Sequence, residues 1–191
     1  MRKTLAVATI IAIGIGGLVG AAAFFTIKPL DNRGIAPRDL RPFWTEVNWP
    51  FPIDQWGTGK AFHCEAADCG AEVTLYLRAK IGFCNCTTGV ADDEELDRVG
   101  DVALFSSSHS VTGPGQPIAV AWMKGRSRPY LIRDSFFSRK SALAIAFNDR
   151  CDVIVATAVV GHNRPTSLEQ TVIEFLNGDL VLRWAESTLG L

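Results

Sequence analysis

The chain has no excess of either charge sign, since 19 lysines and arginines stand against 20 aspartates and glutamates in 191 residues. This balance excludes a bulk attraction to nucleic acid, and we expect no nucleic-acid partner. The sequence also has no internal repeat and no low-complexity segment. With 48% hydrophobic and 20% charged residues it is not a disordered chain, and its length fits one domain with an appendage.

Motifs with a strict chemical meaning are also missing. There is no G-x-S-x-G turn to raise a nucleophilic serine, no C-x-x-C redox motif, and no calcium-loop spacing in the acidic run 92–101. His109 lies among serines, and His162 follows a predicted strand. A Ser–His–carboxylate set can be drawn from these residues, but no motif supports it. We therefore favour a protein without catalysis, cofactor or bound metal.

The longest uncharged run lies at the start of the chain, between Lys3 and Lys28. Its 24 residues are long enough for a helix to cross a bilayer of roughly 30 Å, so residues 1–28 are predicted to be a membrane anchor. The Ala21–Ala23 triplet also fits a signal-peptide cleavage site, and in that alternative the mature protein is secreted. Basic residues at both ends leave the orientation open, but the cysteines favour a domain outside the cytoplasm, as in a periplasm.

Residues 29–60 are rich in proline and tryptophan, which prevents regular helix and supplies large apolar side chains. These rings either pack on the domain or form an aromatic belt at a membrane surface. A basic cluster, predicted at a hairpin tip, is a second candidate contact with a membrane or an acidic partner. The candidate partner or membrane contacts are Trp44, Trp49, Trp56, Lys124, Arg126 and Arg128.

Residues 61–191 are predicted to form an α+β domain. Alternation of apolar and polar residues over 73–81 predicts a strand with one face in water, and 151–160 is typical of a central buried strand. We expect Val155 and Trp122 to share one core with the apolar face of 73–81. The predicted fold is an antiparallel or mixed sheet of about five strands with two to three helices on one face. Further strands are predicted at 102–105, 118–122, 130–132 and 179–184, and helices from 92, over 139–147 and from a Thr166–Glu169 capping box to 177.

The cysteines are the most informative residues of the domain. In an exported protein they predict two disulfides and one spare thiol. Cys64 and Cys69 can close a local loop, and we expect Cys151 to be bridged to the 84–86 pair. Alternatively, if the 73–81 strand lies in a hairpin, the pairs beside it meet and can hold zinc, with or without His63, in a cytoplasm-facing domain. The disulfide candidates are Cys64, Cys69, Cys84, Cys86 and Cys151.

The function that these patterns favour is a binding or accessory module, tethered to a membrane and facing away from the cytoplasm. Such a protein would be a small subunit or partner of an envelope complex. A thiol-redox protein or hydrolase that uses Cys64, Cys69, Cys84, Cys86 or His162 is the first alternative. The zinc-stabilised cytoplasmic domain is the second.

Overall fold

The computed structural model describes residues 42–133, 138–161 and 164–191. The predicted anchor or signal segment 1–28 lies outside these residues, as do 29–41 and His162. None of the helices that the structure describes is long and apolar enough to cross a membrane.

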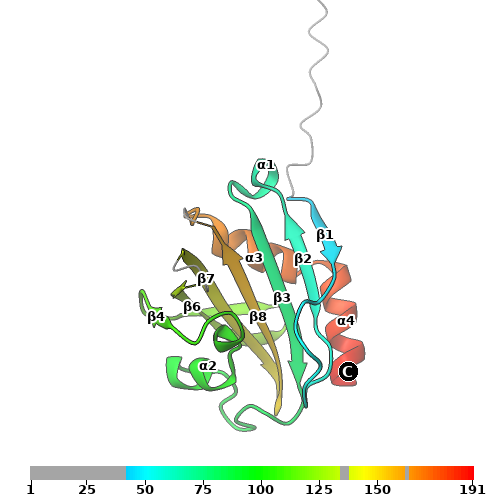
Figure 1. Cartoon of the computed structure of the whole chain (residues 1–191). Coiled ribbons are helices and arrows are strands. Elements are labelled where there is room, and N and C mark those ends of the chain that lie inside the picture. Colours follow the sequence, from blue (N-terminus) through cyan, green and yellow to red (C-terminus); the bar gives the residue numbers. More distant parts are fainter. Residues whose placement is uncertain (1–41, 134–137, 162–163) are drawn as a thin grey trace, which may run out of the picture. The chain divides into compact units, whose positions relative to one another are not determined.

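The described residues form an α+β structure around one antiparallel sheet of eight strands, so the predicted class is confirmed and the count of about five is wrong (Figure 1). The strand order is β1-β2-β3-β8-β7-β6-β4, and β5 shares one edge of β6 with β4. The strands are β1 (Trp44–Val47), β2 (Lys60–Cys64), β3 (Val73–Lys80), β4 (His109–Val111), β5 (Gln116–Val120), β6 (Met123–Arg133), β7 (Arg139–Asp149) and β8 (Asp152–Val160).

Helices cover both faces of the sheet in the described part of the chain. Two C-terminal helices pack on one face and a short helix lies on the other (Figure 1). The expectation of helices on one face only is therefore wrong, because the central strands bury apolar side chains on both sides. The helices are α1 (Ala66–Cys69), α2 (Asp93–Val99), α3 (Leu168–Leu176) and α4 (Asp179–Leu189), with a 3-10 turn, η1 (Val102–Leu104).

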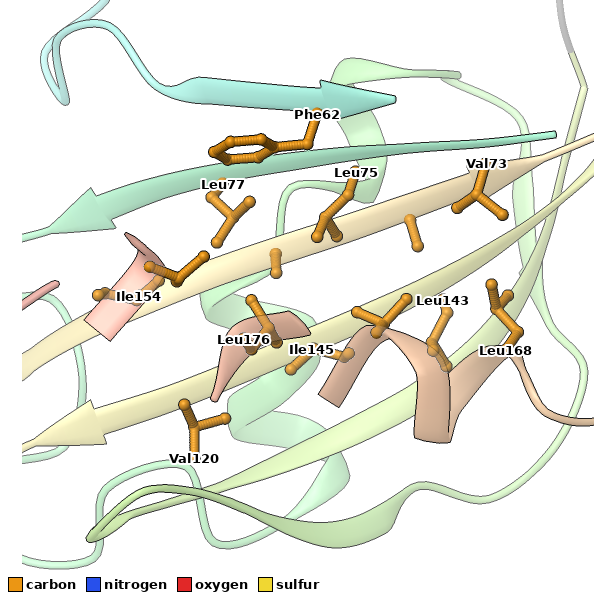
Figure 2. Packing of buried hydrophobic residues seen from close by; sticks show 14 of the residues in the cluster. Phe62, Val73, Leu75, Leu77, Val120, Leu143, Ile145, Ile154, Leu168 and Leu176 are labelled. Atoms are coloured by element: carbon orange, nitrogen blue, oxygen red, sulfur yellow. The ribbon is translucent and has the colours of Figure 1, made fainter. Parts of the chain in front are cut away.

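The face under α3 and α4 is apolar and mostly aliphatic across the central strands (Figure 2). Small residues of β8 lie between large ones of its neighbours: Ala158 stands between Leu75 of β3 and Leu143 of β7. This leaves room for the helical layer, whose Leu168 and Leu176 are completely buried. Packing of this kind is the main stabilising term of a small domain.

The face under α2 differs in composition. Leu96 and Val99 of α2 pack here with Val155, while Trp122 is exposed at the β5–β6 turn. Neither Val155 nor Trp122 thus shares the core of Leu75, which corrects that prediction. The expected wet face of β3 is also wrong, because Arg78 and Lys80 on this side are buried.

Strand β7 corrects the helix predicted over 139–147. Its alanines favour a helix, but residues 142–147 are buried on both faces of the sheet. A strand covered on both sides carries no polar alternation, so its sequence resembles that of a buried helix. Position 125 in β6 requires glycine, because a Cβ there would lie 2.1 Å from the Ala146 carbonyl oxygen of β7. Gly125 and Pro129 favour a turn in sequence, yet the hairpin turns at Ala121–Trp122.

The C-terminal segment is helical where a strand was predicted at 179–184. Val181 and Ala185 stand four residues apart and are buried on one side of α4, which is helical spacing. The predicted strand 102–105 is the 3-10 turn η1. The predicted capping box is absent from α3, since Ser167 is the N-cap residue and Glu169 accepts a hydrogen bond from Ser127 at 2.8 Å.

Candidate functional site

A groove of about 740 Å³ lies between the start of β1 and the α3–α4 corner. Its size falls within the range of ligand sites in proteins. Its lining includes the apolar side chains of Trp44, Phe175 and Leu180, and Leu180 is 54% exposed. The groove is lined by Pro42, Trp44, Gln170, Thr171, Ile173, Glu174, Phe175, Asn177, Gly178, Asp179 and Leu180.

An aromatic stack joins the groove to the core. The Trp44 ring stacks on Phe175 with centroids 4.7 Å apart, and Phe175 meets the buried Phe62 ring at 4.9 Å. Such contacts fix the rings without conformational freedom. The α3–α4 corner is fixed as well, because the Asn177 side-chain amide donates to the Ile173 carbonyl and its oxygen accepts from Ala121. The groove is thus tied to the core and to the β5–β6 turn by these contacts.

The charged residues that line the groove are both acidic. Glu174 accepts a hydrogen bond from the Gln170 amide at 2.8 Å, and Asp179 lies 3.7 Å from Arg183 in an exposed pair. A lining that combines apolar side chains with acidic groups favours apolar ligands that carry positive charge over anionic surfaces. Of the predicted contact residues, Trp44 is the one that lies in this groove.

The other two predicted tryptophans lie against the face of the sheet that α2 covers. Trp49 packs edge-on against Phe51 and Tyr76, and Trp56 packs on Phe83. These rings pack on the domain in the structure.

A buried ionic cluster is the feature that the sequence analysis missed. The Arg78 guanidinium donates two hydrogen bonds to Asp101, at 2.6 and 2.7 Å, and a third to Asp54 at 2.5 Å. The Lys80 ammonium lies 2.9 Å from Asp101 and donates to the Val99 carbonyl oxygen at 2.5 Å. Arg78, Lys80 and Asp101 are each less than a tenth exposed. The sequence signal for this cluster was a pair of basic residues at alternate positions of β3. Alternation of polar and apolar residues usually indicates a strand face exposed to water, so the pair was not recognised as buried.

Burial and paired charges act in opposite directions on the pKa values of Arg78 and Lys80. Burial acts to lower the pKa of Arg78, but hydrogen bonds to Asp101 and Asp54 outweigh it and raise the pKa. For Lys80 burial prevails and lowers the pKa, against the opposing effect of Asp101. The hydrogen bond from Arg78 lowers the pKa of Asp54. With every charge paired, the cluster binds the loop residues Asp54 and Asp101 to β3 and has a structural role.

The basic cluster lies within strand β6 rather than at a hairpin tip. Arg126 forms an ion pair with Asp93, and Arg128 with Asp97 at 2.6 Å, so α2 neutralises both. Lys124 is exposed. The acidic run and the basic cluster, considered separately in the sequence, are thus partners across the α2 face.

The cysteines form two disulfides, Cys64–Cys69 and Cys86–Cys151, and Cys84 is a free, buried thiol. These are the local pair and one of the two long-range pairs that we expected. The two bridges lie at opposite ends of β3, about 25 Å apart for eight residues in extended conformation. The pairs beside this strand therefore do not meet, and no cluster of potential metal ligands occurs among the described residues.

A smaller cavity of about 260 Å³ between α2 and β4 holds His109, Asp97 and Tyr130. The Asp97 carboxylate accepts hydrogen bonds from Tyr130 and Arg128. Burial raises the pKa of Tyr130, and Asp97 raises it further. The His109 Nδ1 lies 3.2 Å from the Ser106 carbonyl oxygen, while the Ser106 hydroxyl is directed at other carbonyls. These contacts do not form a hydrolytic triad.

No protein-family model matches the chain, and its sequence matches no characterised protein.

Proposed function

We propose that this protein is an exported binding module whose groove receives a segment of a partner protein that carries apolar side chains next to lysine or arginine. One observation carries the proposal: a groove of about 740 Å³ that is lined by large apolar side chains and whose charged lining residues are both acidic. Burial of apolar side chains would provide the affinity, and charge complementarity would select a cationic partner.

The compartment follows from the cysteines. Two disulfides fit an oxidising location outside the cytoplasm. In this proposal residues 1–28 direct export, and they either remain as a membrane anchor or are removed. The module then acts as a small accessory subunit of an envelope complex.

A membrane surface is the less suitable occupant of the groove. Bilayers rich in anionic lipid attract basic protein surfaces, whereas Glu174 and Asp179 would face the headgroups here. The groove also lies between two helices and an edge strand, which suits a narrow peptide segment. We therefore commit to a protein segment.

Binding of two synthetic peptides to the full chain in a neutral maltoside detergent tests this proposal by calorimetry. One peptide is an amphipathic helix of leucine and lysine, and the other has glutamate at every lysine position. We expect the lysine peptide to bind at least about tenfold more tightly, because charge complementarity of roughly 1.4 kcal/mol suffices for that factor. Equal affinities would contradict the charge selection.

Leu180→Ala locates the binding site. The variant should weaken binding of the lysine peptide by about tenfold, because it removes roughly 1.5 kcal/mol of apolar burial. Ile81→Ala is the matched control, since Ile81 is 52% exposed and Leu180 54% exposed, and Ile81 does not line the groove. If both variants bind like the parent, the groove is not the site. Binding to phosphatidylglycerol vesicles that Leu180→Ala abolishes, without peptide binding, would make lipid the occupant and overturn the proposal.

A further inference from the structure

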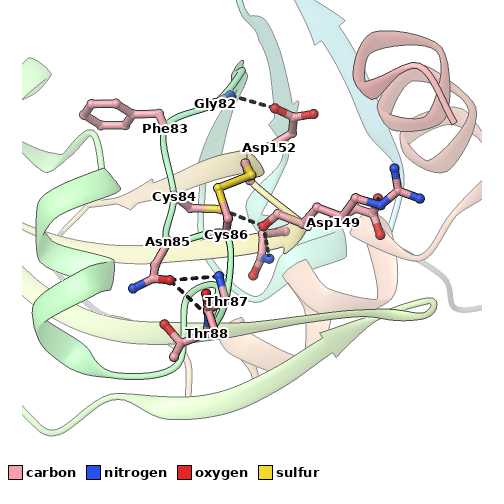
Figure 3. Close-up of a disulfide and its surroundings, with 12 residues drawn as sticks. Gly82, Phe83, Cys84, Asn85, Cys86, Thr87, Thr88, Asp149 and Asp152 are labelled. Carbon is pink, nitrogen blue, oxygen red and sulfur yellow. Dashed lines mark hydrogen bonds and ion pairs between the residues drawn. A yellow bond between two sulfur atoms is a disulfide. The ribbon is translucent and has the colours of Figure 1, made fainter.

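Three cysteines meet where the loop after β3 crosses the β7–β8 turn. Figure 3 shows Cys84 and Cys86 on the same loop, and Cys86 forms a disulfide with Cys151. The Cys84 backbone N–H donates to the Cys151 carbonyl oxygen at 3.0 Å. The Cys84 thiol donates to the carbonyl oxygen of Arg150, the preceding residue, at 3.2 Å. The residue with the free thiol thus contacts the backbone of a residue that takes part in a bridge.

The backbone contact places Cys84 close enough to Cys151 for a bridge. A single N–H···O=C hydrogen bond of ordinary length brings the Cα atoms of its two residues to within roughly 5–6 Å. Disulfides usually span Cα distances of roughly 4.4–6.8 Å, a range that includes this separation, and the existing Cys86–Cys151 bridge spans 4.1 Å. Two hydrogen bonds donated by the backbone hold this loop in place. The Gly82 N–H donates to the Asp152 carboxylate at 2.6 Å, and the Asn85 backbone N–H donates to the Glu95 carboxylate at 2.8 Å.

We propose that Cys84, Cys86 and Cys151 form a disulfide-exchange unit in which Cys151 is bridged to Cys86 or, in a second state, to Cys84. The Cys84 thiol first loses its proton to solvent, and the thiolate attacks the Cys151 sulfur. The Cys84–Cys151 bond forms as the Cys86–Cys151 bond breaks, and Cys86 leaves as a thiolate that takes a proton from water. One disulfide and one thiol are present before and after, so the step needs no oxidant or reductant.

The consequence of exchange is a change in which thiol the solvent can reach. Cys84 is only 6% exposed, whereas Cys86 lies in an exposed part of the loop. The second state therefore presents a thiol that a partner thiol or an oxidant can reach, and the first state conceals it. This device is separate from the groove and does not depend on the proposed binding function.

The surroundings of Cys84 make the first state slow to react. Burial raises the pKa of the Cys84 thiol to about 11, and the carboxylates of Glu95 and Asp152 contribute while Arg98 opposes them. The thiolate is the attacking species. Below pH 11 its fraction rises about tenfold per pH unit, so exchange should be roughly a hundredfold faster at pH 9 than at pH 7.

Trapping with N-ethylmaleimide tests the proposal on the folded full chain under non-reducing conditions. Peptide mapping by mass spectrometry then identifies the labelled cysteine and the remaining bridge. We expect the label to accumulate on Cys86, faster at pH 9 than at pH 7, together with a Cys84–Cys151 bridge. Label on Cys84 alone, or no label until the protein is unfolded, would overturn the proposal.

Two variants provide an independent readout after expression with export to an oxidising compartment. Cys86→Ser should contain a Cys84–Cys151 bridge and no free thiol, and its circular dichroism should match the parent. Cys84→Ser is the control, which should retain Cys86–Cys151 and show no label on Cys86. A folded Cys86→Ser protein with two free thiols would refute exchange. If Cys86→Ser does not fold, the position of the label in the parent chain decides.

Discussion

On strand β3 the odd-numbered residues face α3 and α4, whereas the even-numbered residues face α2 and the aromatic loop before β2. The first set buries aliphatic side chains such as Leu75 against other aliphatic side chains. The second set includes Arg78 and Lys80, which are buried as deeply but against the carboxylate of Asp101. One strand thus supports two kinds of core.

The two cores should respond differently to substitution. An aliphatic core loses stability in proportion to the volume removed, because each methylene contributes separately. A buried ionic cluster depends on its complete set of charges, because the loss of one partner leaves another charge without compensation. The difference implies that the α2 face fixes the positions of loops, while the α3–α4 face provides most of the apolar stabilisation and carries the groove.

The largest effect should come from Asp101→Ala. This change leaves Arg78 and Lys80 buried without their shared carboxylate, and we expect a loss of about 3–5 kcal/mol in the free energy of unfolding. Urea denaturation measures it. Glu46→Ala is the control, since the Glu46–Lys60 pair is largely exposed and should contribute less than about 1 kcal/mol. Similar losses in the two variants would show that the buried cluster has no special weight.

The aliphatic face should give the next largest effect. Leu75→Ala removes a completely buried side chain and should cost about 3 kcal/mol through lost burial and a residual cavity. Thr74→Ala, on the opposite face of the same strand, should cost well under half as much. Thermal denaturation compares the two variants, and equal costs would contradict the assignment of the faces.

The smallest expected effect is on the stability of the fold at acidic pH. Hydrogen bonds from the Gly115 amide and from Arg126 lower the pKa of Asp93, so its ionised form favours the folded state. This contribution is fully present above the unfolded-state pKa of about 3.9 and is lost as the pH falls through the lower folded-state pKa. Asp93→Asn should therefore flatten the loss of stability below about pH 4. The exposed Glu94→Gln is the control, and an identical acid profile for both variants would contradict the assigned role of Asp93.

Strands with a clear pattern could be predicted from sequence. The alternation of 73–80 and the β-branched run of 152–160 identify β3 and β8 because few other structures produce them. Strand β7 could not be identified, since burial on both faces removes the alternation. Helix α4 was mistaken for a strand because its short apolar run is equally compatible with either structure.

The site was predictable only in part. Trp44 could be selected as a contact residue because a large aromatic in a proline-rich segment needs a surface to pack on. The groove itself depends on how β1 meets the α3–α4 corner, and no local pattern encodes that meeting. The ionic cluster joins Asp54, Arg78 and Asp101 across long sequence separations, so its members look like ordinary surface charges.

Mapping the lysine peptide on the isotope-labelled full chain by NMR tests the central claim, that the α3–α4 side binds and the α2 side only stabilises. We expect the largest chemical-shift changes at the Trp44 indole and at backbone amides near the α3–α4 corner, such as Leu180, with signals of Arg78 and Asp101 unchanged. Largest changes at α2 or around Arg128 would contradict the claim.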